Sequence, residues 1–591
     1  MVHLSALSLA LNRPGAVSLE QVVASLFANN EQGAWYDPSD YSTMFQVSTG
    51  ATPVTAVEQP VGLILDRRKG LVLGSELVTN GTFTTDTTSW TMLGTGTFVS
   101  TGGQGVLTVS SGSFYAGQAV TVVSGKWYEV RATFITKTAA STAFFRLGTS
   151  GIGGNEYVGV TPTVDGTEYV YKILTTSTTL YVSVGVNASG YSSTWDNISV
   201  KLLDGNHAYQ TSSTARPVLR ARYNLLTYSE EFDRTTTGGW TRTNIASVTA
   251  NAVSAPDSTT TAEKVVWANA TTDGRLTQIT TMVTGATYTM SAYVKAAEFS
   301  KVLLTAGTAQ FNAAFNLATE SVISSSNAIS PTITPVAGAS GWYRVSVTGV
   351  AQGTGSFIIG NGLTGDTGDG TSGIYIWGAD LRVGTSAGDY QRIAASTDYA
   401  TVSTITGQAF RPYLKFDNDD ATGDYLTTAT IDYSAGDTVF TCAGIRKTGT
   451  RGTIVELSAN ANLNNGAFRT AFGTSANADA LAYTGWSRGT ATTFANTATT
   501  YNVQALDIVT SEMDISTPQN SLRVNAIAAA SDATSQGTGN YGSYAMTVGG
   551  RVSGDRMFGH MYGLIVRAAS MSASQIAAVE SYMASKMGVT L

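Results

Sequence analysis

The chain has 591 residues, of which 13% are charged and 42% are hydrophobic, and its formal net charge is −7. That length predicts about three to five domains, because a single hydrophobic core stops growing well below it. The dispersed negative charge disfavours a nucleic-acid partner, which would need a basic face, and the apolar content excludes a disordered chain. The 62 Gly residues and the abundant Thr and Ser are typical of strands joined by turns.

The single cysteine, Cys442, excludes an internal disulfide. It stands in the alternating run of residues 438–445, so we expect it to act as a small buried hydrophobe. Residues 1–15 lack the basic start and the continuous apolar stretch of a signal peptide. No apolar run approaches the roughly 20 residues that span a bilayer. We therefore expect no membrane insertion, and synthesis in a reducing cytoplasm.

Two capping boxes predict short helices near both ends, over residues 18–28 and 573–587. In each box a serine at the N-cap is followed three residues later by a glutamine, and an apolar face follows at helical spacing. The pairs are Ser18 with Gln21 and Ser572 with Gln575. Gly588 ends the second helix. We expect the first helix to pack against its own chain, and contact with a partner is the alternative.

Between the helices, one pattern of sequence occurs twice. Each copy opens on a phrase that leads to a tryptophan, passes through an alternating phrase and closes on an alternating strand headed by tryptophan. The phrases are residues 76–90, 125–134 and 195–200 in the first copy, and residues 224–240, 285–294 and 377–383 in the second. A fold used twice, with its loops free to differ, suggests surface display rather than enzymatic activity.

The first copy opens on N-G-T-F at residues 80–83, before Trp90, and closes on D-N-I-S-V at residues 196–200. These phrases resemble those of carbohydrate-binding modules with a jelly-roll fold. The second copy departs from both, with Y-S-E-E-F at residues 228–232 and G-A-D at residues 378–380. The resemblance implies a jelly roll in each copy and places the expected glycan site in the first.

Other phrases resemble the laminin-G/concanavalin-A-like domains of bacteriophage structural proteins. They are residues 34–45, 59–70, 205–220 and 413–426. Because the first copy separates them, we expect it to be inserted into a turn of this domain, which is tolerated where a module's ends meet at the surface. The expected units are a helical segment at residues 1–30, a discontinuous sandwich at residues 31–70, 205–220 and 396–591, an inserted jelly roll at residues 71–204 and a second jelly roll at residues 221–395. The predicted fold is all-β, with several β-sandwich domains (jelly-roll and concanavalin-A-like) and short helices near both termini.

Titratable side chains show no catalytic pattern. The three histidines, His3, His207 and His560, lack the spacing of a zinc site, and no G-x-S-x-G phrase supports a nucleophile. Glycoside hydrolysis needs two carboxylates roughly 5–9 Å apart, and the sequence pairs none. We therefore expect a protein that is not an enzyme, with a structural role for each histidine. A polysaccharide depolymerase is the second alternative.

Sugar recognition uses aromatic faces against the C–H groups of a pyranose ring. The candidates for exposed, glycan-binding aromatic residues are Tyr115, Tyr157, Tyr191 and Trp486. Most tryptophans are expected to fill the sandwich cores instead, because they stand in strand-like patterns. These core tryptophans are Trp90, Trp127, Trp195, Trp240, Trp342 and Trp377.

Two acidic clusters are candidate calcium sites, because calcium takes several oxygen ligands from a turn. One cluster holds Asp366 and Asp369, and the other holds Asp417, Asp419 and Asp420. The alternative interpretation is that these aspartates only form turns beside glycine.

Together the resemblances imply a bacteriophage virion structural protein of a tail fibre, spike or head decoration, displayed on the virion surface after synthesis in the bacterial host cytoplasm. Its expected partners are other virion proteins and host surface glycans. We expect a homo-oligomer, with a trimer favoured, held by sandwich faces or helices because no heptad run predicts a coiled coil. A structural cement or fibre protein without sugar binding is the first alternative.

Overall fold

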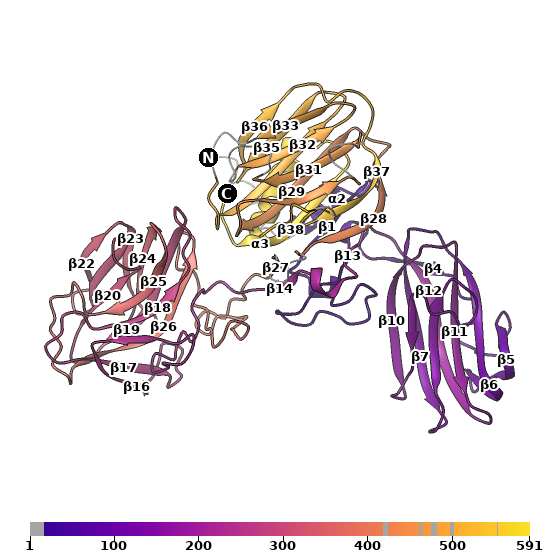
Figure 1. The fold of residues 1–591 in the computed structure, drawn as a ribbon, viewed down its shortest axis with the longest axis horizontal. Coiled ribbons are helices and arrows are strands. Elements are labelled where there is room, and N and C mark those ends of the chain that lie inside the picture. The colour runs from indigo at the N-terminus through magenta and orange to yellow at the C-terminus, as the bar shows by residue number, and fades with distance from the viewer. Residues whose placement is uncertain (1–16, 418–422, 460–463, 474–481, 497–500, 552–553) are drawn as a thin grey trace.

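The computed structural model describes residues 17–417, 423–459, 464–473, 482–496, 501–551 and 554–591. Antiparallel strands form β-sandwiches throughout, with short helices near both termini, which confirms the predicted fold class. Figure 1 shows three lobes: a first module in purple, a second module in magenta to pink, and a central sandwich in orange and yellow between them. Among the residues just given, no helix combines the length and the apolar character needed to cross a membrane.

The first module is one continuous ladder of strands folded into a sandwich. The strands are β4 (Leu73–Glu76), β5 (Thr91–Thr101), β6 (Gln104–Thr121), β7 (Trp127–Lys137), β8 (Ala143–Gly148), β9 (Val158–Val160), β10 (Thr167–Leu174), β11 (Thr179–Asn187) and β12 (Ser192–Leu203). Their order is β10-β7-β12-β6-β11-β8-β9, with β4 on β12 and β5 on β6. The first half of β6 pairs with β12 and the second half with β11, so this long strand joins both layers. Gly112, with φ 66°, lies between the halves, where a left-handed conformation favours glycine.

The second module has two six-stranded sheets. The strands are β15 (Thr241–Thr243), β16 (Ile245–Val253), β17 (Ala262–Trp267), β18 (Arg275–Thr280), β19 (Thr287–Ala296), β20 (Lys301–Thr305), β21 (Asn312–Asn316), β22 (Ser321–Ser326), β23 (Ala328–Pro335), β24 (Trp342–Val350), β25 (Gly355–Gly360) and β26 (Gly373–Val383). Sheet I has the order β15-β18-β25-β20-β21-β22, and sheet II has the order β16-β17-β26-β19-β24-β23. An apolar core between them includes Phe232, Trp240 and Trp267.

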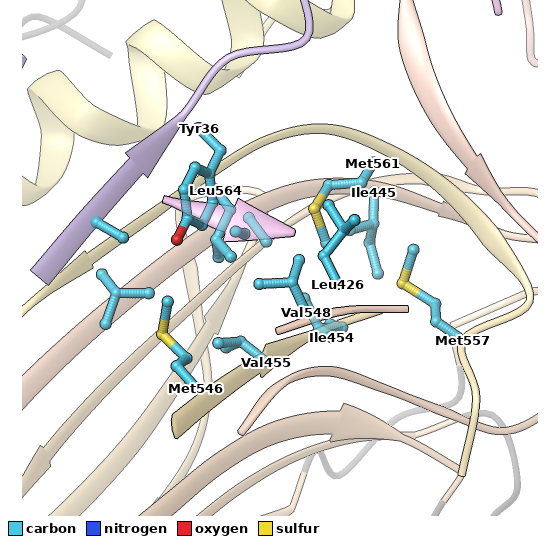
Figure 2. Packing of buried hydrophobic residues seen from close by; sticks show 14 of the residues in the cluster. Tyr36, Leu426, Ile445, Ile454, Val455, Met546, Val548, Met557, Met561 and Leu564 are labelled. Carbon is cyan, nitrogen blue, oxygen red and sulfur yellow. The ribbon is translucent and has the colours of Figure 1, made fainter. Parts of the chain in front are cut away.

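The central sandwich takes its strands from three separated stretches of the chain. They are β1 (Gly33–Tyr36), β2 (Met44–Phe45), β3 (Leu63–Ile64), β13 (Ala208–Tyr209), β14 (Val218–Arg220), β27 (Tyr413–Phe416), β28 (Leu426–Asp432), β29 (Thr438–Lys447), β30 (Gly452–Leu457), β31 (Ala467–Phe472), β32 (Tyr483–Arg488), β33 (Thr492–Asn496), β34 (Leu506–Asp514), β35 (Gln519–Val524), β36 (Ile527–Asp532), β37 (Ser543–Val548) and β38 (Gly559–Arg567). One sheet runs β14-β27-β38-β29-β34-β35-β36, with β1 on β38, and the other runs β2-β3-β13-β28-β37-β30-β31-β32-β33. Figure 2 shows apolar side chains from both sheets meeting in its core, among them Tyr36, Leu426 and Leu564. Where each domain begins and ends stays a prediction.

Both predicted helices are present with their predicted caps. They are α2 (Leu19–Ser25) and α3 (Ala573–Met587), and both capping boxes are formed in full. Gly588 ends α3 in the left-handed conformation. The two helices pack on each other over one apolar cluster, so the first helix covers its own chain as expected. Three short 3-10 helices, η1 (Tyr41–Thr43), η2 (Arg67–Lys69) and η3 (Ser213–Ala215), complete the central lobe.

The buried positions follow the sequence expectations closely. All six expected core tryptophans are at most 7% exposed. Trp127 fills the junction between the first module and the central sandwich, where its ring contacts those of His207 and Tyr209. Cys442 is fully buried, and burial raises the pKa of its thiol to about 12. It is therefore an inert core residue, as predicted.

The repeated phrases form the same contacts in both modules. The indole of Trp90 donates to the carbonyl of Asn80 (3.1 Å), and that of Trp240 donates to the carbonyl of Tyr228 (3.0 Å). The hydroxyls of two equivalent tyrosines accept a backbone N–H five residues earlier. These are Tyr128 with Val123 (2.8 Å) and Tyr288 with Val283 (2.9 Å). The duplication in sequence is thus a duplication of structure.

Candidate functional site

The signature residues of the first module hold its two ends together. The carbonyl of Gly81 accepts from Ile198 N (2.9 Å), and a Cβ at Gly81 would lie 2.0 Å from the carbonyl oxygen of Ile198. Asn197 has φ 51°, which asparagine tolerates, at the bulge where β12 shifts its register on β7. In the second module the carbonyl of Ser229 accepts from Ala379 N in the same way (2.9 Å). The signature residues therefore take part in closing the sandwich, and a glycan site beside them stays a prediction.

A cavity of about 610 Å³ opens on the outward face of sheet I in the second module, and we call it the outer cavity. Its floor comes from β18, β25, β20 and β21, and its wall from the loops around residues 272–274 and 362–366. The lining mixes polar side chains (Asp273, Arg275, Thr305, Thr308, Asn312 and Asp366) with apolar ones (Leu303, Ile358 and Leu363).

The register of the strands sets the floor of the outer cavity. Arg275, Gly360 and Leu303 lie opposite one another across β18, β25 and β20. A Cβ at Gly360 would lie 2.2 Å from the carbonyl oxygen of Gly274, so the close approach of these strands requires glycine. Because the middle residue of this row of three has no side chain, the sheet surface is recessed there, and the cavity lies above it.

Asn361 organises the wall of the outer cavity. Its side chain, on a residue only 1% exposed, accepts from Gly274 N (2.6 Å) and donates to the carbonyls of Thr271 and Asp366 (3.3 Å each). One buried amide therefore fixes both loops. Leaving a buried polar group without a partner costs about 1–3 kcal/mol, so these hydrogen bonds hold the wall in place without a ligand.

An ion pair and a strained residue complete the rim. Lys301 Nζ contacts Asp366 Oδ1 at 2.8 Å and donates to the carbonyl of Thr364 (3.2 Å). Leu363 is 62% exposed and has φ 60°, a conformation uncommon for a non-glycine residue. A strained backbone that presents an apolar side chain to solvent at a cavity mouth is a feature of binding sites.

The equivalent face of the first module can be aligned through a shared glutamine. Gln118 Oε1 accepts from Thr79 N (3.1 Å), and Gln278 Oε1 accepts from Thr227 N (2.8 Å). Counting along the strands, Tyr115 corresponds to Arg275, Gly185 to Gly360 and Phe144 to Leu303, because each trio pairs in one row.

In the first module this row is filled by its own side chains. The rings of Tyr115 and Phe144 stack with centroids 5.6 Å apart, and the guanidinium of Arg146 lies over both, at 5.1 and 4.7 Å. Arg146 also donates to the carbonyl of Gly153 (2.9 Å), whose N–H donates to Ser183 Oγ (3.0 Å). The loop at Gly153 is therefore tied down over Tyr115, which the sequence singled out as a sugar-contacting residue.

The other predicted glycan-binding residues lie apart from one another. Tyr157 packs against the core of the first module, and its hydroxyl contacts Thr176 Oγ1 (2.9 Å). Tyr191 also packs partly buried against that core. Trp486 was expected among the exposed aromatic residues, and this is wrong: it is 6% exposed because it packs against Ala467 in the central sandwich. A glycan-contacting role for any of the four stays a prediction.

The predicted calcium ligands are engaged with other groups. Asp366 pairs with Lys301, and Asp369 accepts from the backbone N–H groups of Thr371 and Ser372 in its own turn. The Ser372 hydroxyl also donates to Asp369 (2.6 Å), and this bond, together with the backbone donors, holds the pKa of Asp369 well below its usual range. Asp417 forms an ion pair with Lys415; Asp419 and Asp420 lie outside the described residues. Within the described part of the chain, no three Asp, Glu, His or Cys side chains gather as a metal site would require; the calcium site stays a prediction.

The buried histidines and a group of carboxyl groups in the second module are the side chains to consider for the depolymerase alternative. His207 and His560 are buried, and burial lowers the pKa of His207 to about 3; His3 lies outside the described residues. A smaller cavity of about 340 Å³ in the second module is lined by Glu230 and Glu263. Burial raises the pKa of Glu230 to about 7, and burial together with Asp233 raises the pKa of Glu263 to about 8. This cavity therefore holds more than one carboxyl group, the residue type that glycoside hydrolysis uses.

Sequence reasoning missed most of the outer cavity. Of its lining residues the sequence singles out only Asp366, and for calcium. The run G-N-G-L-T-G at residues 360–365 marks a loop, but nothing in it shows which sheet face that loop covers. Asn361 could be recognised only from its buried position between two loops.

Comparisons with known proteins give distant likenesses of structure. No protein-family model and no curated protein matches the chain. The tandem CBM22 domains of Paenibacillus barcinonensis Xyn10C match at 12% identity and a TM-score of 0.21, over 53% of this chain and 98% of that one. The CBM40 of a Ruminococcus gnavus sialidase, bound to α2,3-sialyllactose, matches at 13% identity and a TM-score of 0.21, over 26% of this chain and 97% of that one. A putative carbohydrate-binding protein from Bacteroides ovatus matches at 10% identity and a TM-score of 0.22, over 51% and 78%. At TM-scores this low, none of these likenesses identifies the function of the chain.

Proposed function

We propose that this chain binds glycans through the outer cavity of its second module. The observation that carries the proposal is that this cavity is open, rigid and mixed in polarity, while the equivalent row of the first module is filled. Its volume of about 610 Å³ lies in the range of small-molecule sites, roughly 300–1,000 Å³. A saccharide fits such a lining, because its C–H faces need apolar contacts and its hydroxyls need hydrogen-bond partners.

Each part of the lining has a role in that proposal. Arg275 and Asn312 offer donors for sugar hydroxyls, and Leu303 and Leu363 offer apolar surface to the ring. Because Asn361 fixes the wall in advance, a ligand loses less free energy to ordering on binding. No aromatic ring lines this cavity, so we expect weak single-site affinity. An oligomer would then raise the effective affinity by engaging several sites at once.

The wider setting that we propose is adhesion by a bacteriophage virion protein of a tail fibre, spike or head decoration. Support comes from the phrases at residues 31–70, 205–220 and 413–587 that resemble phage structural proteins. The non-catalytic part of the proposal is supported by the absence of any catalytic pattern in the sequence. Mass spectrometry of purified virions, with antibody labelling to locate the chain, tests the setting, and virions that lack the chain would refute it.

The binding proposal is tested by transferring the filled row of the first module to the second. The double variant Arg275→Tyr, Leu303→Phe gives sheet I the Tyr115 and Phe144 pair of the first module. The purified full chain is first screened on a glycan array, and the bound glycan is then titrated by calorimetry. We expect the double variant to bind roughly tenfold or more weakly. Ile279→Phe, on the same strand but outside the lining, is the matched control and should bind normally. Equal binding by the double variant and the control would refute the proposed site.

A further inference from the structure

A second cavity of the second module lies on its other sheet. It has a volume of about 530 Å³ and is formed by β19, β24 and β23 of sheet II with the loop at residues 385–388. Hydroxyl groups dominate its lining: Ser330, Thr332, Thr334, Ser346, Thr348, Thr385 and Ser386. Strand alternation brings them to one face, since Thr332 lies opposite Ser346 and Ser330 opposite Thr348. We call it the hydroxyl cavity.

A cationic side chain, that of Arg344, lies among these hydroxyl groups. The guanidinium of Arg344 lies over the ring of Tyr293 (5.3 Å) and donates to Ser291 Oγ (3.0 Å) and to the carbonyls of Ala387 (3.2 Å) and Gly388. These contacts fix the plane of the guanidinium at the edge of sheet II. Its Nε is buried and has no hydrogen-bond partner.

Arg344 has no carboxylate partner in the part of the chain that the structure describes. The nearby Arg382 pairs with Asp380, whereas Arg344 forms no ion pair with Asp380, with Asp389 or with any other carboxylate of the described residues. A positioned guanidinium without a carboxylate attracts anions through its permanent charge. Because Nη2 of Arg344 already donates twice and Nε is buried, Nη1 is the nitrogen that would donate to a carboxylate or a sulfate.

We propose that the hydroxyl cavity binds an acidic saccharide, with Arg344 anchoring its anionic group and the surrounding hydroxyls contacting its sugar hydroxyls. A hydroxyl-lined floor suits a polyhydroxylated ligand better than an apolar one, since each hydroxyl both donates and accepts. The inference extends the proposed function to acidic sugars at a separate site. The outer cavity and the hydroxyl cavity lie on opposite sheets, so an experiment can refute one proposed site without refuting the other.

The test uses the full chain and three probes of matched size: a glucuronate-containing trisaccharide, a sulfated trisaccharide and the neutral trisaccharide. Calorimetry at low and physiological salt should show binding of an acidic probe that weakens as salt rises. Arg344→Gln should weaken that binding roughly 10- to 100-fold, because a hydrogen-bonded charged group is lost. The Arg275→Tyr, Leu303→Phe variant should bind it normally. Which acidic probe binds distinguishes a carboxylate from a sulfate ligand.

A second variant keeps the test decisive if Arg344→Gln disturbs folding. Thr334→Val removes a lining hydroxyl from an exposed residue and keeps the shape of the side chain. It should weaken acidic-probe binding several-fold while thermal unfolding stays unchanged. Failure of both acidic probes to bind, equal binding of neutral and acidic probes, or unchanged affinity in both variants would overturn the proposal. Loss of neutral-glycan binding in the Arg275→Tyr, Leu303→Phe variant alone would leave it standing.

Discussion

The first and second modules share one frame but use the same sheet face in opposite ways. In the first, Tyr115, Phe144 and Arg146 fill the row above the strands. In the second, Arg275 and Leu303 leave that row open beneath a wall held by Asn361. In this duplicated fold, the contacts that close the sandwich are the same in both copies. The side chains at three paired strand positions decide whether the sheet face is open to a ligand.

The largest effect is expected from the residue that closes the first module. Gly81→Ala places a Cβ about 2.0 Å from the carbonyl oxygen of Ile198, and we expect it to destabilise the first module by about 3 kcal/mol, at the upper end of overpacking costs. Urea unfolding followed by tryptophan fluorescence measures the change. Thr82→Ala, an exposed neighbour, is the control. An unfolding midpoint unchanged by Gly81→Ala would contradict the closure contact.

The next effect separates the wall of the outer cavity from its lining. Asn361→Ala removes the partner of three backbone groups and should destabilise the second module by about 2 kcal/mol and abolish glycan binding. Asn312→Ala removes a lining amide and should weaken binding without lowering the melting temperature. Calorimetry and thermal unfolding together check both. If Asn361→Ala bound glycans normally, the wall would not be part of the site.

A smaller effect is expected when an aromatic ring is removed from the sheet face of the first module. Phe144→Leu introduces the residue that stands at the equivalent position of the second module. Loss of the stacking on Tyr115 should cost about 1 kcal/mol. A crystal structure of the variant should show a hollow beside Tyr115, where the ring of Phe144 now lies. Collapse of the loop at Gly153 into that space would show that the frame alone cannot keep the row open.

The two modules are also expected to differ in how their stability depends on pH. Burial and Asp233 raise the pKa of Glu263 to about 8, so the folded second module holds a proton that the unfolded chain releases near pH 4.5, and its stability falls from about pH 4.5 to pH 8. In the first module, burial opposes ionisation of Glu129, but Arg131 and Lys172 together hold its pKa below the usual range. Its contribution is therefore lost only as the pH falls into the acid range.

Replacing Glu263 isolates this effect. Glu263→Gln should reduce the pH dependence of the second module, as followed by urea unfolding at several pH values, and Glu230, whose pKa burial raises to about 7, should account for the part that remains. Glu129→Gln should leave that slope unchanged and destabilise the first module near neutral pH. A second module whose stability rises from pH 5 to pH 8 would contradict the raised pKa of Glu263.

The features that could be predicted from the sequence are those set by residues close together along the chain. The capping boxes at Ser18 and Ser572 predict both helices, because a cap is made within four residues. The burial of Cys442 and of the core tryptophans follows from strand alternation. The burial of Trp486 was missed, because the same alternation does not show which face a partner layer covers.

The outer cavity could not be predicted because it arises between distant residues. Arg275, Gly360 and Leu303 meet only through the register of three strands. The signature of the first module predicts a glycan site there, which stays a prediction, and its residues Gly81 and Asn197 take part in closing the sandwich. A site that consists of empty space has no residue pattern of its own.

Hydrogen exchange of the full chain with a bound array-selected neutral glycan tests the central claim most directly, because it reports both modules in one experiment. The account predicts slower exchange at residues 271–275, 303–312 and 358–366, with no change at residues 114–117 and 143–148. Protection confined to the first module, around Tyr115 and Phe144, would contradict it.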